Sequence, residues 1–367
     1  MSALNLPVKP QMACGPFKGR GTSLNPTSRF EAAQHEHFED GWNIEDEPAR
    51  PRTSLIRDTT RSIITRNDSP DICFSQSVNP YRGCEHGCIY CFARPSHAYL
   101  GFSPGLDFET QIVFKPEAPR LLEKELSRPG YKPSVIVLGS NTDPYQPVER
   151  TLGLTRAILE LLERFNHPVG IITKSANILH DQEILARMAA KKLVRVHISV
   201  TTLDPVLARA MEPRAATPGK RLAAISSLTQ AGVEVCVMAS PMIPGLNDTE
   251  LEQILEEAQH KGATSAAMTL LRLPHELGDL FSHWLQTHVP GRASHVLSLL
   301  RQTHNGKLNE ADFHNRMSGS GPYAALLHQR FRKALQRLGL NKADTPLDSS
   351  QFHVPGRVSA QSQLSLF

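Results

Sequence analysis

Short apolar runs alternate with longer amphipathic segments between residues 72 and 273. Runs rich in Val, Ile and Leu predict strands. They cover residues 72–78, 111–114, 135–138, 169–173, 194–200, 233–239 and 265–270. Apolar residues at helical spacing predict helices over residues 118–126, 154–165, 181–190, 220–231 and 249–260. In 154–165, for example, Leu154, Ile158 and Leu162 share one face with Leu161 and Phe165.

Strands that alternate with helices predict a parallel sheet. Six or seven such units favour an α/β fold of the TIM-barrel kind, closed or partial, here a partial (β/α)6 barrel over residues 71–273. Sites in such barrels lie at the carboxyl ends of the strands. The flanks look different. We expect a partly disordered N-terminal arm (1–70) that wraps the core or hangs loose, a helical extension (274–340) closed by a helix over 323–338, and a flexible tail (341–367).

Composition adds little to this picture. The chain has 367 residues, with 40% hydrophobic and 21% charged, which is ordinary for one large folded domain with extensions. A net charge of +4 is compatible with nucleic-acid binding but does not argue for it. The start of the chain lacks a signal-peptide pattern, and no apolar stretch approaches the ~20 residues of a membrane span. We therefore expect a soluble, cytoplasmic protein without a membrane partner.

The candidate chemistry is a cluster of three cysteines. Cys84, Cys88 and Cys91 form a C-x3-C-x2-C run directly after the first predicted strand, with Gly83 and Gly87 allowing tight turns around sulfur. Three thiolates can hold three irons of a cubane cluster and leave the fourth iron open. Zinc is the alternative, with His86 or His97 as a fourth ligand, but no second cysteine pair is visible.

The other metal-ligand candidates are weaker. The remaining cysteines are scattered, and we interpret them as small buried or incidental residues: Cys14, Cys73 and Cys236. The segment after Leu273 is rich in histidine, but the spacing fits no metal site. Its histidines are His275, His283, His288, His295, His304 and His314.

The cysteine run, with Tyr90 just before its last cysteine, resembles the signature of the radical S-adenosylmethionine superfamily, and the resemblance covers about residues 72–273. It implies a [4Fe–4S] cluster whose open iron binds S-adenosylmethionine. One-electron reduction, by a donor such as flavodoxin or ferredoxin, then gives a 5′-deoxyadenosyl radical that abstracts hydrogen from a substrate.

Within the superfamily the chain resembles the spore photoproduct lyase-like, or DNA repair photolyase, branch. The resemblance lies in strand-end segments 139–147, 173–175, 199–202, 212–214, 218–221 and 240–248. It makes Tyr90, Thr142, Asp143, Lys174, Ser199 and Met242 candidates to hold S-adenosylmethionine. Lys174 can neutralise the methionyl carboxylate, and Thr142, Asp143 and Ser199 can bond its amino or ribose groups.

Structural alternatives stand beside these roles. Lys174 could be a solvated strand end, Ser199 could bond locally, and Asp143 could form a turn before Pro144. Glu212 and Arg214 could form an exposed ion pair of little value, or stand over the site.

One position departs from the lyase. Spore photoproduct lyase has a cysteine in the third-strand segment that returns a hydrogen atom to its product radical, and Ser140 stands there in this chain. A serine O–H bond is too strong for that role, which puts thymine-dimer lysis by the same route in doubt. Cys236 lies on another strand.

The chain ends Gln363-Leu364-Ser365-Leu366-Phe367, which resembles the peptide that docks bacterial replication and repair proteins on the DNA sliding clamp. Apolar anchors on a flexible tail suit such docking, although the tail could instead pack on the barrel. We expect a radical enzyme that acts on DNA. The alternatives are a radical enzyme for a protein, tRNA or small metabolite, and a non-catalytic cluster or zinc scaffold or sensor. No catalytic residue is assigned.

Overall fold

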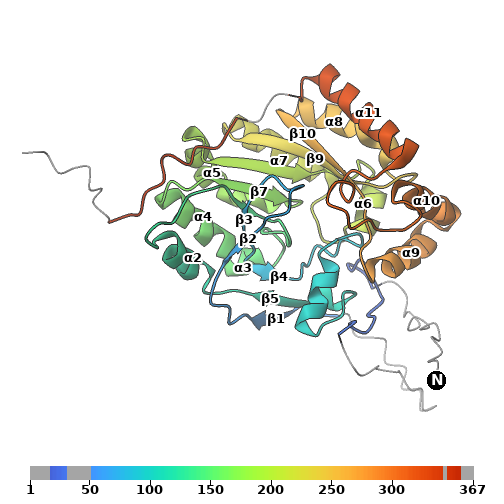
Figure 1. The fold of residues 1–367 in the computed structure, drawn as a ribbon, viewed down its shortest axis with the longest axis horizontal. Coiled ribbons are helices and arrows are strands. Elements are labelled where there is room, and N and C mark those ends of the chain that lie inside the picture. Colours follow the sequence, from blue (N-terminus) through green and yellow to red (C-terminus); the bar gives the residue numbers. More distant parts are fainter. Residues whose placement is uncertain (1–16, 31–50, 342–344, 357–367) are drawn as a thin grey trace, which may run out of the picture.

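A computed structural model describes residues 17–30, 51–341 and 345–356. Its main feature is a seven-stranded sheet with the strand order β10-β9-β8-β7-β6-β3-β2 (Figure 1). Six of these strands are parallel: β3 (Gln76–Val78), β6 (Ile136–Leu138), β7 (Val169–Thr173), β8 (Val194–Ser199), β9 (Glu234–Met242) and β10 (Ser265–Leu270). The antiparallel strand β2 (Ile64–Arg66) ends the sheet beside β3. The predicted partial (β/α)6 architecture is confirmed.

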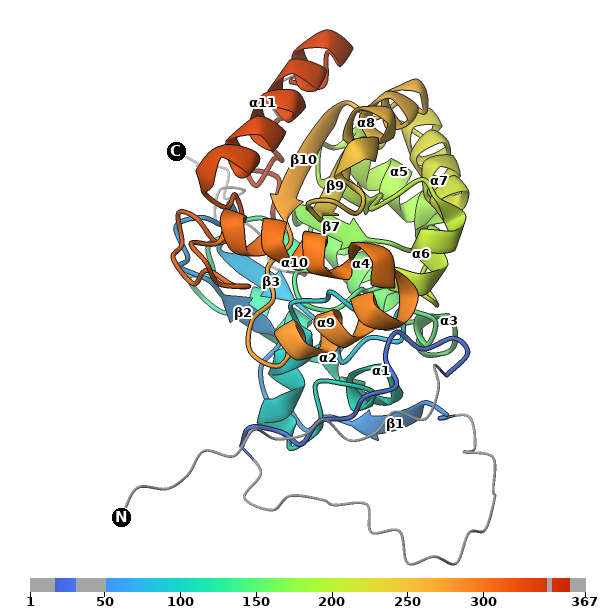
Figure 2. The same ribbon diagram turned by 90° about the vertical axis from the view of Figure 1, so that its right-hand side faces the viewer.

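Helices between the strands form the outer layer (Figures 1 and 2). The long ones are α2 (Ala118–Leu126), α4 (Leu154–Arg164), α5 (Gln182–Ala190), α7 (Pro218–Gln230) and α8 (Leu251–His260). The apolar stripe predicted on α4 is buried: Ile158 and Leu162 are fully covered and pack in the core with strand residues such as Ile171. Burial of this stripe against the sheet explains why the helix forms where the periodicity places it.

Short elements complete the connections. They are α1 (Asp107–Thr110), α3 (Glu149–Leu152), α6 (Pro205–Met211) and the 3-10 helices η1 (Arg94–Leu100), η2 (Ala176–Asp181) and η3 (Asp248–Glu250).

Three strand predictions need correction. The run 111–114 does form a strand, β5 (Gln111–Phe114), but it pairs with β1 (Ser54–Arg57) and β4 (Tyr81–Arg82) in a separate three-stranded sheet. A short apolar run specifies an extended backbone but not its partner strand. The strand predicted over 72–78 is paired only over Gln76–Val78, whereas β9 extends past the predicted end at residue 239.

The described parts of the flanks contact the core or form helices. Residues 17–30 lie against the core, with Leu24 buried and its carbonyl accepting from Leu106 N at 3.0 Å. The histidine-rich segment forms α9 (Leu277–His288) and α10 (Pro290–Thr303), ahead of α11 (Gly321–Leu338). Residues 345–356 return to the sheet, where Phe352 packs on Phe165.

None of the helices in the described ranges combines the length and apolar character that crossing a membrane requires. The sliding-clamp-like peptide at residues 363–367 lies outside the described residues, as does Cys14.

Candidate cofactor site

Cys84, Cys88 and Cys91 lie in one loop that follows β4, near the carboxyl ends of the parallel strands. Cys84 and Cys88 are buried and Cys91 is partly exposed. Burial raises the pKa of all three thiols, and the pKa of Cys84 is raised further by its neighbours Cys88 and Cys91. The three thiols lie in one loop, and a cation would stabilise their thiolates.

The donor set fits an iron–sulfur cluster better than a single zinc ion. Three thiolates can each bind one iron of a cubane and leave the fourth iron open, whereas a structural zinc ion takes four protein ligands. Of the two candidate fourth zinc ligands, His86 has a partner, because its Nδ1 faces Asp143 at 3.3 Å. His97 Nε2 lies 3.1 Å from the Gln111 carbonyl oxygen, and its Nδ1 has no hydrogen-bond partner among the described residues.

A buried ion pair shapes the cluster loop. Arg94 and Glu109 pair with side chains that are fully buried, and Arg94 also donates to the carbonyl oxygens of Cys88 at 2.8 Å and Gly87 at 3.1 Å. Gly87 has a φ of 66°, and a Cβ there would lie 2.5 Å from a Glu109 carboxylate oxygen. Sequence analysis missed this pair because its members are separated by fifteen positions and carry no motif.

Two residues of the N-terminal arm bind Glu109, which pairs with the arginine that holds the cluster loop. Gly21 N donates to Glu109 Oε2 at 2.9 Å, and Arg20 donates to the Glu109 carbonyl oxygen at 2.8 Å. A Cβ at position 21 would lie 1.8 Å from the carbonyl oxygen of Gly87. The arm and the cluster loop therefore touch backbone to backbone.

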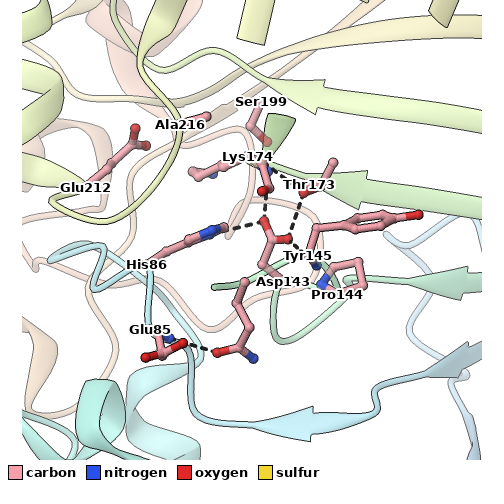
Figure 3. A network of polar contacts seen from close by, with 12 residues as sticks. Glu85, His86, Asp143, Pro144, Tyr145, Thr173, Lys174, Ser199, Glu212 and Ala216 are labelled. Atoms are coloured by element: carbon pink, nitrogen blue, oxygen red, sulfur yellow. Dashed lines mark hydrogen bonds and ion pairs between the residues drawn. The ribbon is translucent and has the colours of Figure 1, made fainter. Parts of the chain in front are cut away.

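Asp143 is the centre of a polar network at the ends of β6 and β7 (Figure 3). Its carboxylate accepts from Thr173 Oγ1 at 2.7 Å, Lys174 N at 2.7 Å and Tyr145 N at 2.9 Å, and it pairs with His86. Burial opposes ionisation, but His86 and the hydrogen bonds lower the pKa of Asp143 to about 2. Each oxygen has two partners, so the carboxylate has no lone pair left for a ligand. Its observed contacts orient Lys174 and His86.

Lys174 and Tyr90 face each other across the cluster loop. The Lys174 ammonium lies 5.7 Å from the centroid of the Tyr90 ring. Burial and Arg221 lower the pKa of Lys174, whereas the thiols of Cys88 and Cys91 oppose that shift. The structure thus brings together three cysteines, Tyr90 and Lys174, which are all predicted site residues.

The other predicted residues lie nearby with different partners. Ser199 and Met242 are buried at the ends of β8 and β9, and the β7–β8 register puts Lys174 beside Ser199. Thr142 is also buried, but its hydroxyl donates to the Tyr81 carbonyl oxygen at 3.0 Å. The predicted contact of Thr142 with a cofactor would compete with this internal bond.

Glu212 is a buried anchor of the site and is not an exposed partner of Arg214. It accepts a hydrogen bond from Thr201 Oγ1 at 2.8 Å and from the Tyr90 hydroxyl, and it pairs with Arg221. Arg214 instead pairs with Glu85 at 2.8 Å. The interpretation as an exposed pair was wrong, because the Glu212 side chain points to Arg221 in α7 and the Arg214 side chain points to Glu85 in the cluster loop.

Ser140 and Cys236 also have defined places. Ser140 Oγ accepts from Asn79 Nδ2 at 3.1 Å, beside the end of β6. Cys236 is buried within β9, with its sulfur 3.7 Å from the Val237 carbonyl oxygen, and Cys73 is exposed ahead of β3. In the described ranges, the cluster loop is therefore the place where thiols gather at the carboxyl edge of the sheet.

Comparisons with known proteins agree with this geometry. The model of the radical SAM superfamily matches residues 78–258. An uncharacterized protein of Mycobacterium tuberculosis is 38% identical over 231 residues, which cover 62% of this chain and 68% of that protein. An uncharacterized protein of Methanocaldococcus jannaschii is 27% identical over 173 residues, covering 47% of this chain and 62% of that one.

Solved structures give the same fold. Spore photoproduct lyase complexed with dinucleoside spore photoproduct superposes with a TM-score of 0.57 and 13% identity, covering 77% of this chain and 79% of that one. A cysteine-to-serine variant of spore photoproduct lyase gives a TM-score of 0.51 and 14% identity, with the same coverage. At such identity the likeness establishes the fold alone.

Proposed function

We propose that this chain, which belongs to the radical S-adenosylmethionine superfamily, directs the radical chemistry of that superfamily at a nucleic acid. The protein is a radical S-adenosylmethionine enzyme whose cofactors are a [4Fe–4S] cluster and S-adenosylmethionine. When bound, these cofactors supply a carbon-centred radical that removes a hydrogen atom from the substrate.

The residues have distinct roles in this proposal. Cys84, Cys88 and Cys91 are the cluster ligands. Lys174 neutralises the carboxylate of S-adenosylmethionine, and Asp143 holds the backbone of Lys174 at 2.7 Å. Glu212 accepts a hydrogen bond from the Tyr90 hydroxyl and also binds Thr201, after β8, and Arg221, in α7. These contacts hold Tyr90 and the cluster loop against both elements.

The observation that carries the nucleic-acid proposal is the extent of the fold likeness. The superfamily model ends at residue 258, but the likeness to spore photoproduct lyase covers 77% of the chain. That neighbour holds a dinucleoside photoproduct, so the shared scaffold can place a pair of nucleotides before the radical. DNA is the nucleic acid we favour. Ser140 makes hydrogen return by a thiol at that position impossible, so the reaction differs there from lysis by the lyase route.

Two partners belong to the proposal. A one-electron donor such as flavodoxin or ferredoxin is needed to reduce the cluster. The second partner is the sliding clamp, and its binding stays a prediction. The docking peptide would be Gln363-Leu364-Ser365-Leu366-Phe367. It would bring the enzyme to replicating or repaired DNA.

The test uses the anaerobically reconstituted full chain. With dithionite and S-adenosylmethionine it should form 5′-deoxyadenosine. Damaged DNA should raise the yield, and the same DNA in deuterated form should pass deuterium into 5′-deoxyadenosine. Replacing Cys88 with Ala is the control, because loss of one thiolate removes the cluster. Formation of 5′-deoxyadenosine that no DNA stimulates, with deuterium transferred from a peptide or metabolite instead, would refute the nucleic-acid substrate. Transfer from tRNA instead of DNA would refute the choice of DNA.

A further inference from the structure

Exposed aromatic rings in this protein are paired with arginines. Four Phe and Tyr side chains are strongly exposed in the part of the chain that the structure describes, and each has a guanidinium over its ring. The pairs are Phe30 and Tyr99 with Arg29, Phe92 with Arg272, and Phe313 with Arg316. Exposed apolar side chains that are scattered singly need no explanation, but this recurrence does.

Two of the pairs lie at the opening of the partial barrel. Phe92 follows Cys91 directly, and Arg272 follows the end of β10 with its guanidinium 5.3 Å from the Phe92 ring. The loop after α10 crosses from β10 toward the other side of the sheet (Figure 2). It is held there by Leu270 N, which donates to the Met317 carbonyl oxygen at 2.9 Å.

The same loop reaches the segment before β3. Arg316, whose guanidinium lies 4.7 Å from the Phe313 ring, binds Asp71 through two hydrogen bonds, one of them 2.6 Å long. We call Phe92, Arg272, Phe313 and Arg316 the aromatic–arginine strip. It runs from the residue after the cluster loop and the end of β10 to the segment before β3.

The strip carries an uncompensated positive charge. Asp71 is the carboxylate that interacts with the charges of both arginines. Both of its oxygens already accept hydrogen bonds from Arg316. Arg272 is half-buried and, within the described ranges, has no hydrogen bond or ion pair with a carboxylate. Burial and Arg316 lower the pKa of Arg272, and Asp71 opposes the shift. A partly desolvated guanidinium without an anion is unfavourable, and a phosphate would supply the missing charge.

A second unsatisfied group lies near Arg272. His304 is fully buried and interacts with the charge of Arg272. Its Nδ1 lies 3.0 Å from the Leu300 carbonyl oxygen, but its Nε2 has no hydrogen-bond partner among the described residues. Because Nδ1 lies against a carbonyl oxygen it carries the ring proton, which leaves Nε2 as an unpaired acceptor.

We propose that the aromatic–arginine strip binds a single-stranded or extruded stretch of the nucleic-acid substrate, with Arg272 on a phosphate and Phe92 and Phe313 stacking on bases. This inference rests on the proposed function and names how its substrate is held. Aromatic faces stack on any base, and arginine adds charge and planar hydrogen bonding to phosphate. The exposed fractions of Phe92 and Phe313, 47% and 44%, leave their rings available for such stacking.

The experiment measures fluorescence anisotropy of a labelled short oligothymidylate with the reconstituted full chain. Arg272→Gln should weaken binding about tenfold and lower the salt slope by about one. Phe92→Leu and Phe313→Leu should each weaken binding about fivefold or more. An abasic oligomer of the same length separates the roles, because it should still respond to Arg272→Gln but not to the Phe changes.

The matched control is Arg164→Gln. Arg164 also stands over an aromatic ring, that of Phe165 at 5.9 Å, but it lies at the end of α4 in the outer layer. Arg164→Gln removes the same charge as Arg272→Gln but outside the aromatic–arginine strip, so oligothymidylate affinity should stay at the wild-type value. Iron content and circular dichroism confirm that each variant is folded and loaded.

The outcomes distinguish this inference from the proposed function. If wild type binds oligothymidylate and the three strip variants bind equally well, the strip proposal is wrong and the nucleic-acid function stands. If wild type binds no oligonucleotide, both fail. If the variants instead slow reduction of the cluster by flavodoxin and leave oligonucleotide binding unchanged, the strip is a donor-docking surface and the proposal is overturned.

Discussion

The contact between the N-terminal arm and the cluster loop can be broken with a single methyl group. Gly21→Ala would place a Cβ 1.8 Å from the Gly87 carbonyl oxygen, which is far inside van der Waals contact. The arm or the loop must then move. Displacement of the arm breaks the bond from Gly21 N to the buried Glu109 carboxylate, and a hydrogen bond to a charged group contributes about 1.5–3 kcal/mol.

Movement of the arm also exposes Leu24, whose side chain is 8% exposed and whose full burial stabilises by about 1.5–3 kcal/mol. Complete detachment would therefore cost about 3–6 kcal/mol, with partial relaxation costing less. The assays are urea unfolding of the cluster-free protein and the rate at which cluster absorbance bleaches in air. We expect lower unfolding free energy and faster bleaching, because the loop that carries the thiols loses its support.

Gly291→Ala is the matched control. Gly291 lies in α10, where a Cβ meets nothing within 4 Å, and alanine should stabilise that helix by about 0.5–1 kcal/mol. If Gly21→Ala unfolds and bleaches like Gly291→Ala, the arm does not support the cluster loop and the reasoning fails.

Three further predictions concern the site and its surroundings. Alanine at any of the three cluster cysteines should abolish bound iron and sulfide, measured colorimetrically; iron retained at wild-type levels would contradict the ligand assignment. Glu212→Ala leaves Arg221 buried without its anion and should lower the unfolding free energy by about 3–5 kcal/mol in urea titrations; a loss below about 1 kcal/mol would speak against this pair. Burial raises the pKa of Glu149 from 4.5 to about 7, so stability should fall by about 3 kcal/mol between pH 4.5 and 7. Glu149→Gln should remove that slope, and an unchanged slope would show another group is responsible.

The sign for Glu149 follows from the direction of its shift. A raised pKa means that the folded state binds the proton more tightly than the unfolded chain does. The stabilising effect is present below the unfolded value of 4.5 and disappears as the pH rises through about 7.

Local patterns in the sequence were read correctly where the structure depends on neighbours along the chain. The bounds of α2, β5, β7 and β10 match their predictions, because apolar periodicity reflects which side of an element is buried. The helical extension expected over 274–340 contains α9, α10 and α11, and apolar residues such as Phe281, Trp284 and Leu285 lie at helical spacing in α9.

Partner choice could not be predicted from those patterns. The strand β5 was placed in the barrel although it pairs with β1 and β4. Glu212 and Arg214 were given two alternatives, an exposed pair or a place over the site, and their side chains in fact bind Arg221 and Glu85. A pairing between residues far apart in sequence depends on where the chain turns, and turns are not encoded by the two paired residues.

The sequence by itself predicted the class of fold and gathered the three candidate cluster ligands in one loop. Both are local properties, since three thiols within eight residues share one loop and burial alternates at fixed periods. Tertiary structure alone decided what supports that loop: the Arg94–Glu109 pair, the Glu212 anchor on Tyr90, and the arm at Gly21. It also set Arg272 over the ring of Phe92, with no carboxylate bound to it within the described ranges. These contacts join separate segments, so they exist only once the packing of the sheet and its helices has brought the segments together.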